Sequence, residues 1–149
     1  AEGLDESLRA SREGDWGRFV PLCAAVEAEI ADLDPADARE FLADYGIAEP
    51  ARERVIGLSY DLLGQMSFLT VGEDEVRAWT IPKQARAVEA AAAIHSDIAR
   101  GFIRAEVLDW ESTLAFGGFD EARKQGKIRL EGKDYVVQDG DVISFRFNV

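Results

Sequence analysis

The stretch that decides the fold is the end of the chain, residues 127–149, which read KIRLEGKDYVVQDGDVISFRFNV. Apolar side chains alternate there in three runs, separated by the turn-like segments EGKD and DGD: Ile128/Leu130, Tyr135/Val137 and Ile143/Phe145/Phe147. A period of two between tight turns predicts the closing strands of a small sheet. Because two strands alone are marginal in water, the rest of the chain must supply partners.

Composition narrows the class of protein. The chain has 149 residues, 47% of them hydrophobic, which is enough to bury a core and excludes a disordered protein. With one cysteine and one histidine, it cannot form a disulfide framework and has too few ligands for a Cys/His zinc site. No apolar run approaches the roughly 20 residues of a membrane span, and no secretion signal is evident. We expect a cytoplasmic protein that does not enter a membrane.

Charge is distributed unevenly. The formal net charge is -12; residues 1–65 hold 6 Lys/Arg against 15 Asp/Glu, and residues 66–149 hold 11 against 14. The acidic first part should repel polyphosphate backbones, whereas the second part leaves room for a local basic patch. An ordinary mixed-charge surface is an equally good interpretation. If the patch exists, we expect RNA or partner contacts at Arg100, Arg104, Lys124 and Lys127.

The first part of the chain has helical and strand signals. Residues 4–13 predict a short amphipathic helix, residues 18–23 a short buried strand, and residues 24–30 the start of a helix. This order is a piece of an α/β unit that lacks its other strands. Since the chain also has no initiator methionine, we expect that Ala1 is not the natural start of the polypeptide.

Two further helices are predicted from their end signals. Asp34 is a good N-cap with Pro35 at the first helical position, and this helix should run to about Tyr45, with Gly46 just beyond its end. A second helix opens at residues 49–50 and ends at Gly64, with an apolar stripe at Val55, Ile56, Ser59, Leu62 and Leu63. Joined by a short turn, the two helices predict a hairpin.

From residue 66 onward the pattern is mainly that of strands. We predict a β-hairpin, then a helix, a third strand, a helical piece broken at residues 117–118, and the closing strands; the bounds are 66–71, 75–81, 84–94, 102–108 and 111–125. The order ββα, β, ββ is that of a β-grasp sheet with a helix across one face. The predicted fold class is therefore α+β.

Few residues invite a catalytic interpretation. The chain has no GxxxxGK[ST] phosphate loop, so these residues alone should not hydrolyse nucleotides, and we assign no catalytic residue and no metal ligand. His95, near Asp97, could be a base or a phosphate contact, but a histidine closing the alanine-rich helix, as imidazolium at its negative end, is the better interpretation. Cys23 has no basic neighbour in sequence, and we expect it to be buried and inert.

Five segments together resemble one family. They are FVPLCAAVEAEI at 19–30, VRAWTI at 76–81, IHSD at 94–97, GFIRAE at 101–106 and LEGKDYVVQDGDV at 130–142. In this order they resemble the C-terminal part of the YchF/Obg-like ATPases, over nearly the whole chain. The resemblance implies a parent P-loop NTPase that uses Mg²⁺, prefers ATP to GTP, binds the ribosome through its RNA or its proteins, and ends in a TGS domain of β-grasp fold.

The resemblance also implies domains and a site. Residues 1–33 would be the tail of the nucleotide-binding domain, residues 34–65 a helical hairpin connector and residues 66–149 the TGS domain. Cys23, Ala24 and Ala25 match the family's last guanine-nucleotide-domain motif, where backbone amides approach the base. The phosphate loop and magnesium ligands would lie upstream of Ala1, so this segment would serve recognition and not hydrolysis.

The chain departs from the family at one place, and alternatives to the implied function remain open. Where the family has a glycine-threonine-lysine-alanine-proline run, this chain has QARAV at 84–88, and Ala92 replaces a glycine. Loss of glycine and proline predicts a longer or stiffer helix start. The alternative function is a β-grasp module that binds another protein and no nucleic acid. An enzyme built on His95 and Asp97 is disfavoured, because its groups have no convergent partners in sequence.

Overall fold

The computed structural model describes residues 20, 22–72 and 74–148, and the chain divides into two compact units, residues 1–62 and 63–149. The first unit contains helices α2 (Ala24–Ala31), α3 (Pro35–Asp44) and α4 (Ala51–Leu62). The second contains strands β1 (Gln65–Val71), β2 (Val76–Pro82), β3 (Phe102–Asp109), β4 (Arg129–Glu131) and β5 (Asp141–Phe147) and helices α5 (Ala87–Ile94), α6 (Ser96–Arg100), α7 (Trp110–Ala115) and α8 (Phe119–Lys124). None of the helices described here has the length and apolarity that a membrane crossing requires.

The ends of α3 follow from its capping residues. The Asp34 carboxylate accepts hydrogen bonds from the amides of Ala36 at 2.9 Å and Asp37 at 3.1 Å, which also lower the pKa of Asp34. Beyond the helix, Gly46 takes a left-handed φ of 65°, and the amide of Ile47 donates to the carbonyl of Leu42 at 2.9 Å. The predicted cap and stop are confirmed.

The core of the first unit joins α2 to α3. Val26 and Ile30 pack against Leu42, with Ala38, Phe41 and Ile47 around them. Glu27 accepts a hydrogen bond from the amide of Ala51 at 2.9 Å, which ties the start of α4 to α2. The predicted apolar stripe of α4 remains largely exposed at Val55, Ile56, Leu62 and Leu63.

The strand predicted for residues 18–23 is wrong at the positions that the structure describes. Val20, Leu22 and Cys23 lie in no strand, and both Leu22 and Cys23 are exposed, contrary to the expected buried cysteine. A strand needs a partner, and the described residues of the first unit contain no other strand to pair with. Residues 18, 19 and 21 and the helix predicted for 4–13 lie outside the described residues.

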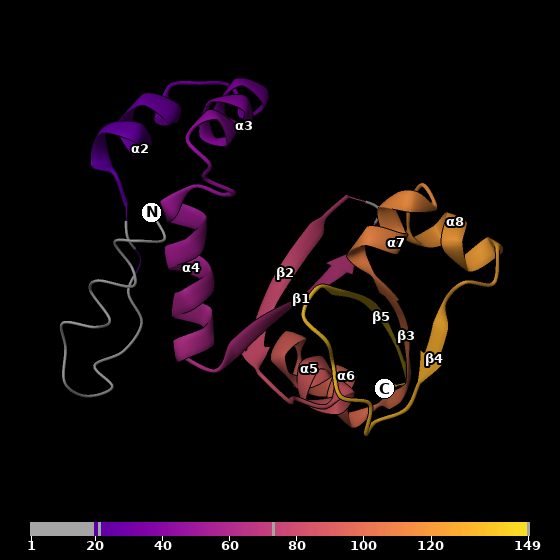
Figure 1. Ribbon diagram of the computed structural model, residues 1–149. Helices are drawn as coiled ribbons and strands as arrows, with labels where there is room; N and C mark the ends of the chain where they lie inside the picture. Colours follow the sequence, from indigo (N-terminus) through magenta and orange to yellow (C-terminus); the bar gives the residue numbers. More distant parts are fainter. Residues whose placement is uncertain (1–19, 21, 73, 149) are drawn as a thin grey trace. The chain divides into compact units, whose positions relative to one another are not determined.

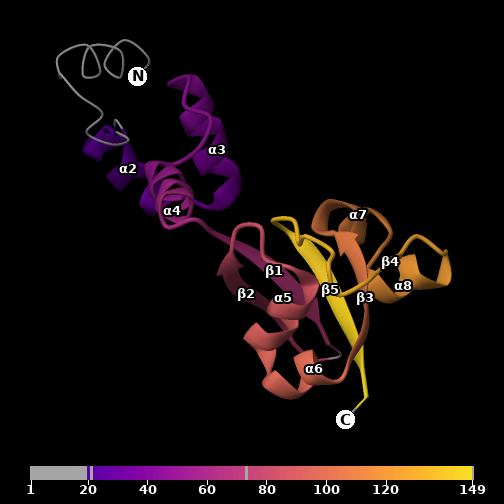
Figure 2. The ribbon, with the colours of Figure 1, turned by 90° about the horizontal axis from the view of Figure 1, so that it is seen from below.

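The second unit is built on one mixed sheet, with the strand order β2-β1-β5-β3-β4. β1 pairs with β2 as the predicted antiparallel hairpin, from Gln65 opposite Pro82 to Val71 opposite Val76. β5 pairs parallel to β1 and antiparallel to β3, while β4 pairs only with β3. The last strand of the chain therefore lies at the centre of the sheet, between β1 and β3 (Figures 1 and 2).

Two apolar layers hold this sheet. On one face, fully or nearly fully buried side chains from the strands meet the alanines of α5, chiefly Phe68, Ile81, Ala90, Val107 and Ile143. Alanines without exposed surface let the α5 backbone approach the sheet closely. On the opposite face, α8 contributes Phe119 and Ala122 to a smaller cluster with Leu108 and Val142. In Figures 1 and 2, α7 and α8 lie together, apart from α5 and α6.

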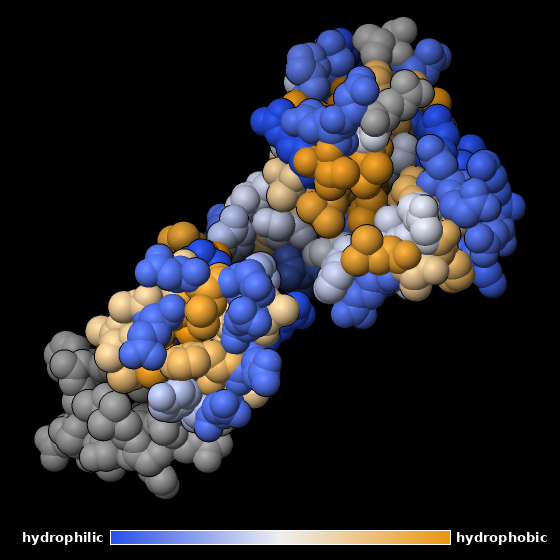
Figure 3. All heavy atoms as spheres, turned by 90° about the horizontal axis from the view of Figure 1, so that it is seen from above, coloured by the Kyte–Doolittle hydropathy of each residue, from blue (hydrophilic) through white to orange (hydrophobic). Residues whose placement is uncertain are grey.

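Part of the second unit's surface is apolar. Large hydrophobic side chains with at least 40% of their surface exposed include Val71, Val76, Leu114 and Leu130. In Figure 3 hydrophobic groups in orange gather between hydrophilic groups in blue on the face shown. Scattered exposed apolar residues are normal, but a patch between charged groups can contact a partner.

The middle run of the closing segment, Tyr135/Val137, does not form a sheet strand as predicted. It is attached instead to the start of α5: the Ala87 amide donates to the Tyr135 carbonyl at 2.8 Å, and the Val137 amide donates to the Ala85 carbonyl at 3.0 Å. The Tyr135 hydroxyl donates to buried Asp141 at 2.7 Å. Burial first, and then this hydrogen bond, raises the pKa of Tyr135 to about 12. The alternation of apolar residues at 135 and 137 therefore reflects pairing with the segment before α5, and not a strand of the sheet.

The helix predicted for residues 84–94 begins later, at Ala87. Gln84 occupies the left-handed region with φ 69°. The helix start is fixed locally, because the Arg86 amide donates to Glu89 at 2.7 Å. The short helix α6 was not predicted.

Gln84→Gly should stabilise the chain by about 1 kcal/mol, because glycine adopts a positive φ without the steric cost that a side chain adds. Urea unfolding measures the change. The matched control is Gln125→Gly, where φ is -82° and no strain is relieved, so stability should stay the same or fall. Equal effects of the two substitutions would contradict the account.

Gly101→Ala should destabilise the second unit by about 1–3 kcal/mol. A Cβ at this position would lie 2.1 Å from the carbonyl oxygen of Asn148, whose amide donates to Gly101, so the end of the chain must move. Gly132→Ala is the control, because its Cβ meets no atom within 4 Å. Thermal unfolding that ranks the two variants in the opposite order would show that the contact is not rigid.

Candidate functional site

The candidate site lies on the sheet face opposite α5 and is set by the alternation of β3 and β5. Because Ala105 and Val107 belong to the core under α5, Arg104 and Glu106 project from the other face. On β5, Arg146 lies directly opposite Arg104, and Ser144 lies opposite Glu106. Two arginines and a glutamate from neighbouring strands thus share one face.

A third arginine completes what we call the arginine cluster, defined as Arg104, Arg123 and Arg146 around Glu106. Arg146 donates to Glu106 from Nε at 2.9 Å and from Nη2 at 3.3 Å. Arg123, on α8, donates from Nε at 3.0 Å and also pairs with Asp120. The nearest guanidinium nitrogen of Arg104 lies 3.9 Å from the carboxylate.

The cluster combines a buried anion with exposed cations. Only 7% of the Glu106 side chain is exposed, compared with 52% for Arg104 and 49% for Arg146. The hydrogen bonds from Arg146 lower the pKa of Glu106 against the opposing effect of burial, and they raise the pKa of Arg146. Glu106 is therefore ionised at neutral pH and holds the guanidinium groups at the surface.

Of the four basic residues expected to contact RNA or a partner, only Arg104 lies in the cluster. Arg100 pairs with Asp97 on α6, Lys124 pairs with Glu121 at 3.1 Å, and the Lys127 ammonium lies 6.0 Å from the centre of the Phe116 ring. Sequence reasoning missed the cluster as a unit, including Glu106 and Arg146. Arg104, Glu106 and Arg146 lie on the same face because of the alternation along β3 and β5, and this can be deduced only once the pairing of the two strands is known.

His95 has a capping role. Its Nδ1 accepts a hydrogen bond from the amide of Asp97 at 3.1 Å, and His95 is the N-cap of α6 as well as the C-cap of α5. The position of His95 at the end of α5 is as predicted, and its ring also caps the next helix.

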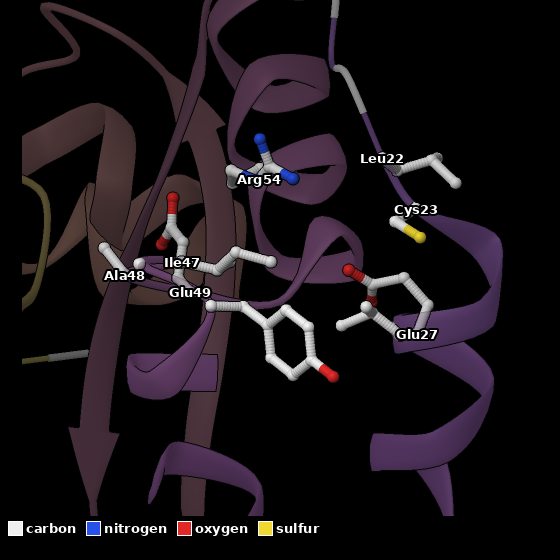
Figure 4. Close-up of a pocket in the computed structure, with 10 residues that line it drawn as sticks. Leu22, Cys23, Glu27, Ile47, Ala48, Glu49 and Arg54 are labelled. Carbon is white, nitrogen blue, oxygen red and sulfur yellow. The ribbon is translucent and has the colours of Figure 1, made fainter. Parts of the chain in front are cut away.

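The first unit contains a pocket beside Cys23. It has a volume of about 500 Å³, and its lining includes Cys23, Glu27, Ile47 and Arg54 (Figure 4). Cys23 is the N-cap residue of α2, and its side chain makes no capping hydrogen bond. Ala24 and Ala25, predicted with Cys23 to bind a base, form the exposed first turn of α2. Among the residues that the structure describes, no three His, Cys, Asp or Glu side chains group as metal ligands.

These features define a class before any comparison: an α+β chain with a five-stranded mixed sheet that carries an exposed arginine cluster, next in sequence to a helical unit. Residues 65–148 match the family model described as "YchF-GTPase_C: Protein of unknown function (DUF933)". The chain belongs to the YchF family.

Curated relatives and a solved structure agree with this family. The "Ribosome-binding ATPase YchF" of Haemophilus influenzae is 54% identical over 140 residues, covering 94% of this chain and 38% of the relative. The protein of the same name from Bacillus subtilis is 50% identical over 142 residues, covering 95% and 39%. The structure of the Schizosaccharomyces pombe YchF GTPase matches 98% of this chain and 38% of that one, with TM-score 0.73 and 25% identity. The chain thus spans about two fifths of the length of these relatives.

Arg146→Met should destabilise the second unit by about 2 kcal/mol at neutral pH, because it leaves buried Glu106 with fewer partners. Arg100→Met, which breaks only an exposed pair, should cost under about 1 kcal/mol. Since the folded-state pKa of Glu106 lies below 4.5, its contribution is present above pH 4.5 and is lost as pH falls through the folded value. The difference in the free energy of unfolding between wild type and Arg146→Met should therefore shrink below pH 4.5. A difference that stays constant as the pH is lowered would contradict the pairing of Arg146 with Glu106.

Proposed function

We propose that this chain is the C-terminal segment of a cytoplasmic YchF-type P-loop NTPase that binds the ribosome, with ATP preferred over GTP, and that the segment serves recognition. The observation that carries the proposal is family membership over 94% or more of the chain, with relatives named ribosome-binding ATPases. In the parent protein, ATP and Mg²⁺ would be held by residues outside this segment. Phosphoryl transfer to water would be catalysed there by positioning and charge stabilisation.

The proposed recognition domain is a TGS domain of β-grasp fold, covering residues 66–149. Two features support it: the order β2-β1-β5-β3-β4 with a parallel central pair, and α5 in the crossover between β2 and β3. A helix against one face of such a sheet, with the other face partly uncovered, leaves a surface for a partner.

The proposed tail of the nucleotide-binding domain covers residues 1–33, followed by a connector at 34–65. Cys23, Ala24 and Ala25 are proposed to approach the base, and their place at the N-terminus of α2 supports this, since first-turn amides there have no partner within the helix. Small side chains at these positions leave room for a planar base. The pocket beside Cys23 adds an accessible cavity at the same helix end.

The second candidate function is a module that binds another protein without nucleic acid. The exposed apolar side chains Val71 and Val76 of the β1–β2 hairpin favour it, as does the acidic balance of residues 66–149. We favour ribosomal RNA, because the exposed arginine cluster supplies guanidinium groups that suit phosphate.

Co-sedimentation of the 149-residue chain with purified 70S ribosomes tests the proposal. We expect the chain to pellet with ribosomes at 50 mM salt and to be released progressively towards 300 mM, because each phosphate contact displaces counterions. An apolar protein interface would show little dependence on salt. No binding by this chain, while a complete YchF protein binds under the same conditions, would contradict a recognition role for the segment.

A further inference from the structure

The arginine cluster contains an arrangement that is unfavourable in isolation. Arg104 and Arg146 lie directly opposite each other on neighbouring antiparallel strands. Like charges at such paired positions repel and destabilise a sheet. Glu106 offsets part of this repulsion, and it hydrogen-bonds to Arg146 rather than to Arg104. An additional anion near Arg104 would relieve the rest.

The donors of the cluster are only partly used. A guanidinium has five N–H groups, yet Arg104 makes no hydrogen bond within the described residues, and Arg146 uses two nitrogens on Glu106. Arg123 divides its contacts between Glu106 and Asp120. Three cations therefore face two carboxylates, which leaves a local positive charge on a strongly acidic chain.

Two arginines of the cluster, Arg123 and Arg146, are also held in place before any ligand arrives. Glu106 fixes Arg146 from β5 and Arg123 from α8 through three hydrogen bonds of 2.9 to 3.3 Å. Rigid donors lose little conformational entropy when they bind, so more of the interaction appears as affinity. The neighbouring Ser144 and Leu130 leave this part of the face open, since Leu130 is 62% exposed and Ser144 is only half-buried.

We propose that the arginine cluster binds a phosphate group of the ribosomal RNA backbone, with Arg104 as the main contact and Arg123 and Arg146 beside it. This rests on the proposed function, because it names the part of the ribosome that the second unit recognises. Glu106 acts as a positioning residue that orders the guanidinium groups of Arg123 and Arg146 and does not touch the RNA. Planar guanidinium groups donate two parallel hydrogen bonds to a phosphate, which an ammonium group cannot do.

The test uses the full 149-residue chain, purified 70S ribosomes and the RNA extracted from them, with affinity measured by fluorescence anisotropy from 50 to 300 mM salt. Arg104→Gln removes one charge, a contact of only 3.9 Å and the repulsion from Arg146, so its unfolding midpoint should equal or exceed that of wild type. We expect roughly threefold to fivefold weaker binding to both probes, and a salt slope smaller by about 0.7 to 0.9, which corresponds to one lost phosphate contact.

Arg77→Gln is the matched control, because it removes the same charge from the same unit outside the cluster, where Arg77 lies over the Trp79 ring of β2. It should change affinity less than twofold. Equal effects of the two variants, or no effect of Arg104→Gln, would overturn the assignment to the cluster while the chain's ribosome binding stands. Competition by poly-glutamate as strong as that by RNA at equal charge would overturn RNA as the ligand. If the wild-type chain binds neither probe, the proposed function fails together with this inference.

Discussion

The position of the last strand constrains the whole second unit. β5 lies between β1 and β3, so seven residues near the end of the chain complete pairings begun by segments far upstream. β5 joins β1 to β3, and its side chains Ile143 and Val142 belong to the apolar clusters on the two faces of the sheet. Gly101 adds to this constraint, because the backbone of Asn148 leaves no room for a Cβ there. Contacts between strands so distant in sequence slow folding in general, because the entropy of closing the loop between them is lost first.

The central strand also connects stability with the candidate site. β5 brings Arg146 next to Arg104, and the resulting repulsion is partly offset by Glu106 of β3, which pairs with Arg146 and with Arg123 of α8. A buried carboxylate is costly unless it is paired and hydrogen-bonded, and here the arginines that pair with it are also exposed to a partner. The same contacts therefore hold α8 on the sheet and order the donors of the proposed phosphate site.

Local signals in the sequence predicted much of the fold. Asp34, Pro35 and Gly46 each act within one turn of chain, so the bounds of α3 could be predicted from neighbouring residues alone. Alternation likewise predicted β1, β2 and β3. The errors arise where distant contacts decide. The apolar side chains at 135 and 137 alternate because this segment pairs with the start of α5, and not with a strand. Gln84 takes a left-handed φ that its side chain does not favour.

The candidate site was only partly predictable for the same reason. Arg104 stood out as a cation in the less acidic part of the chain, but its relation to Arg146 depends on strand register across about 40 residues of intervening sequence. Glu106 has no distinguishing local pattern, since an acidic residue on a strand is usually solvated. Its role follows from burial and from three arginine contacts that only the folded sheet creates.

An electron cryo-microscopy map of this chain bound to the ribosome tests the central claim most directly. The account predicts that the sheet face opposite α5 lies against ribosomal RNA, with the Arg104 guanidinium within hydrogen-bonding distance of a backbone phosphate oxygen. A map in which the chain contacts only ribosomal protein, or approaches the RNA with the α5 side while Arg104 faces solvent, would contradict it.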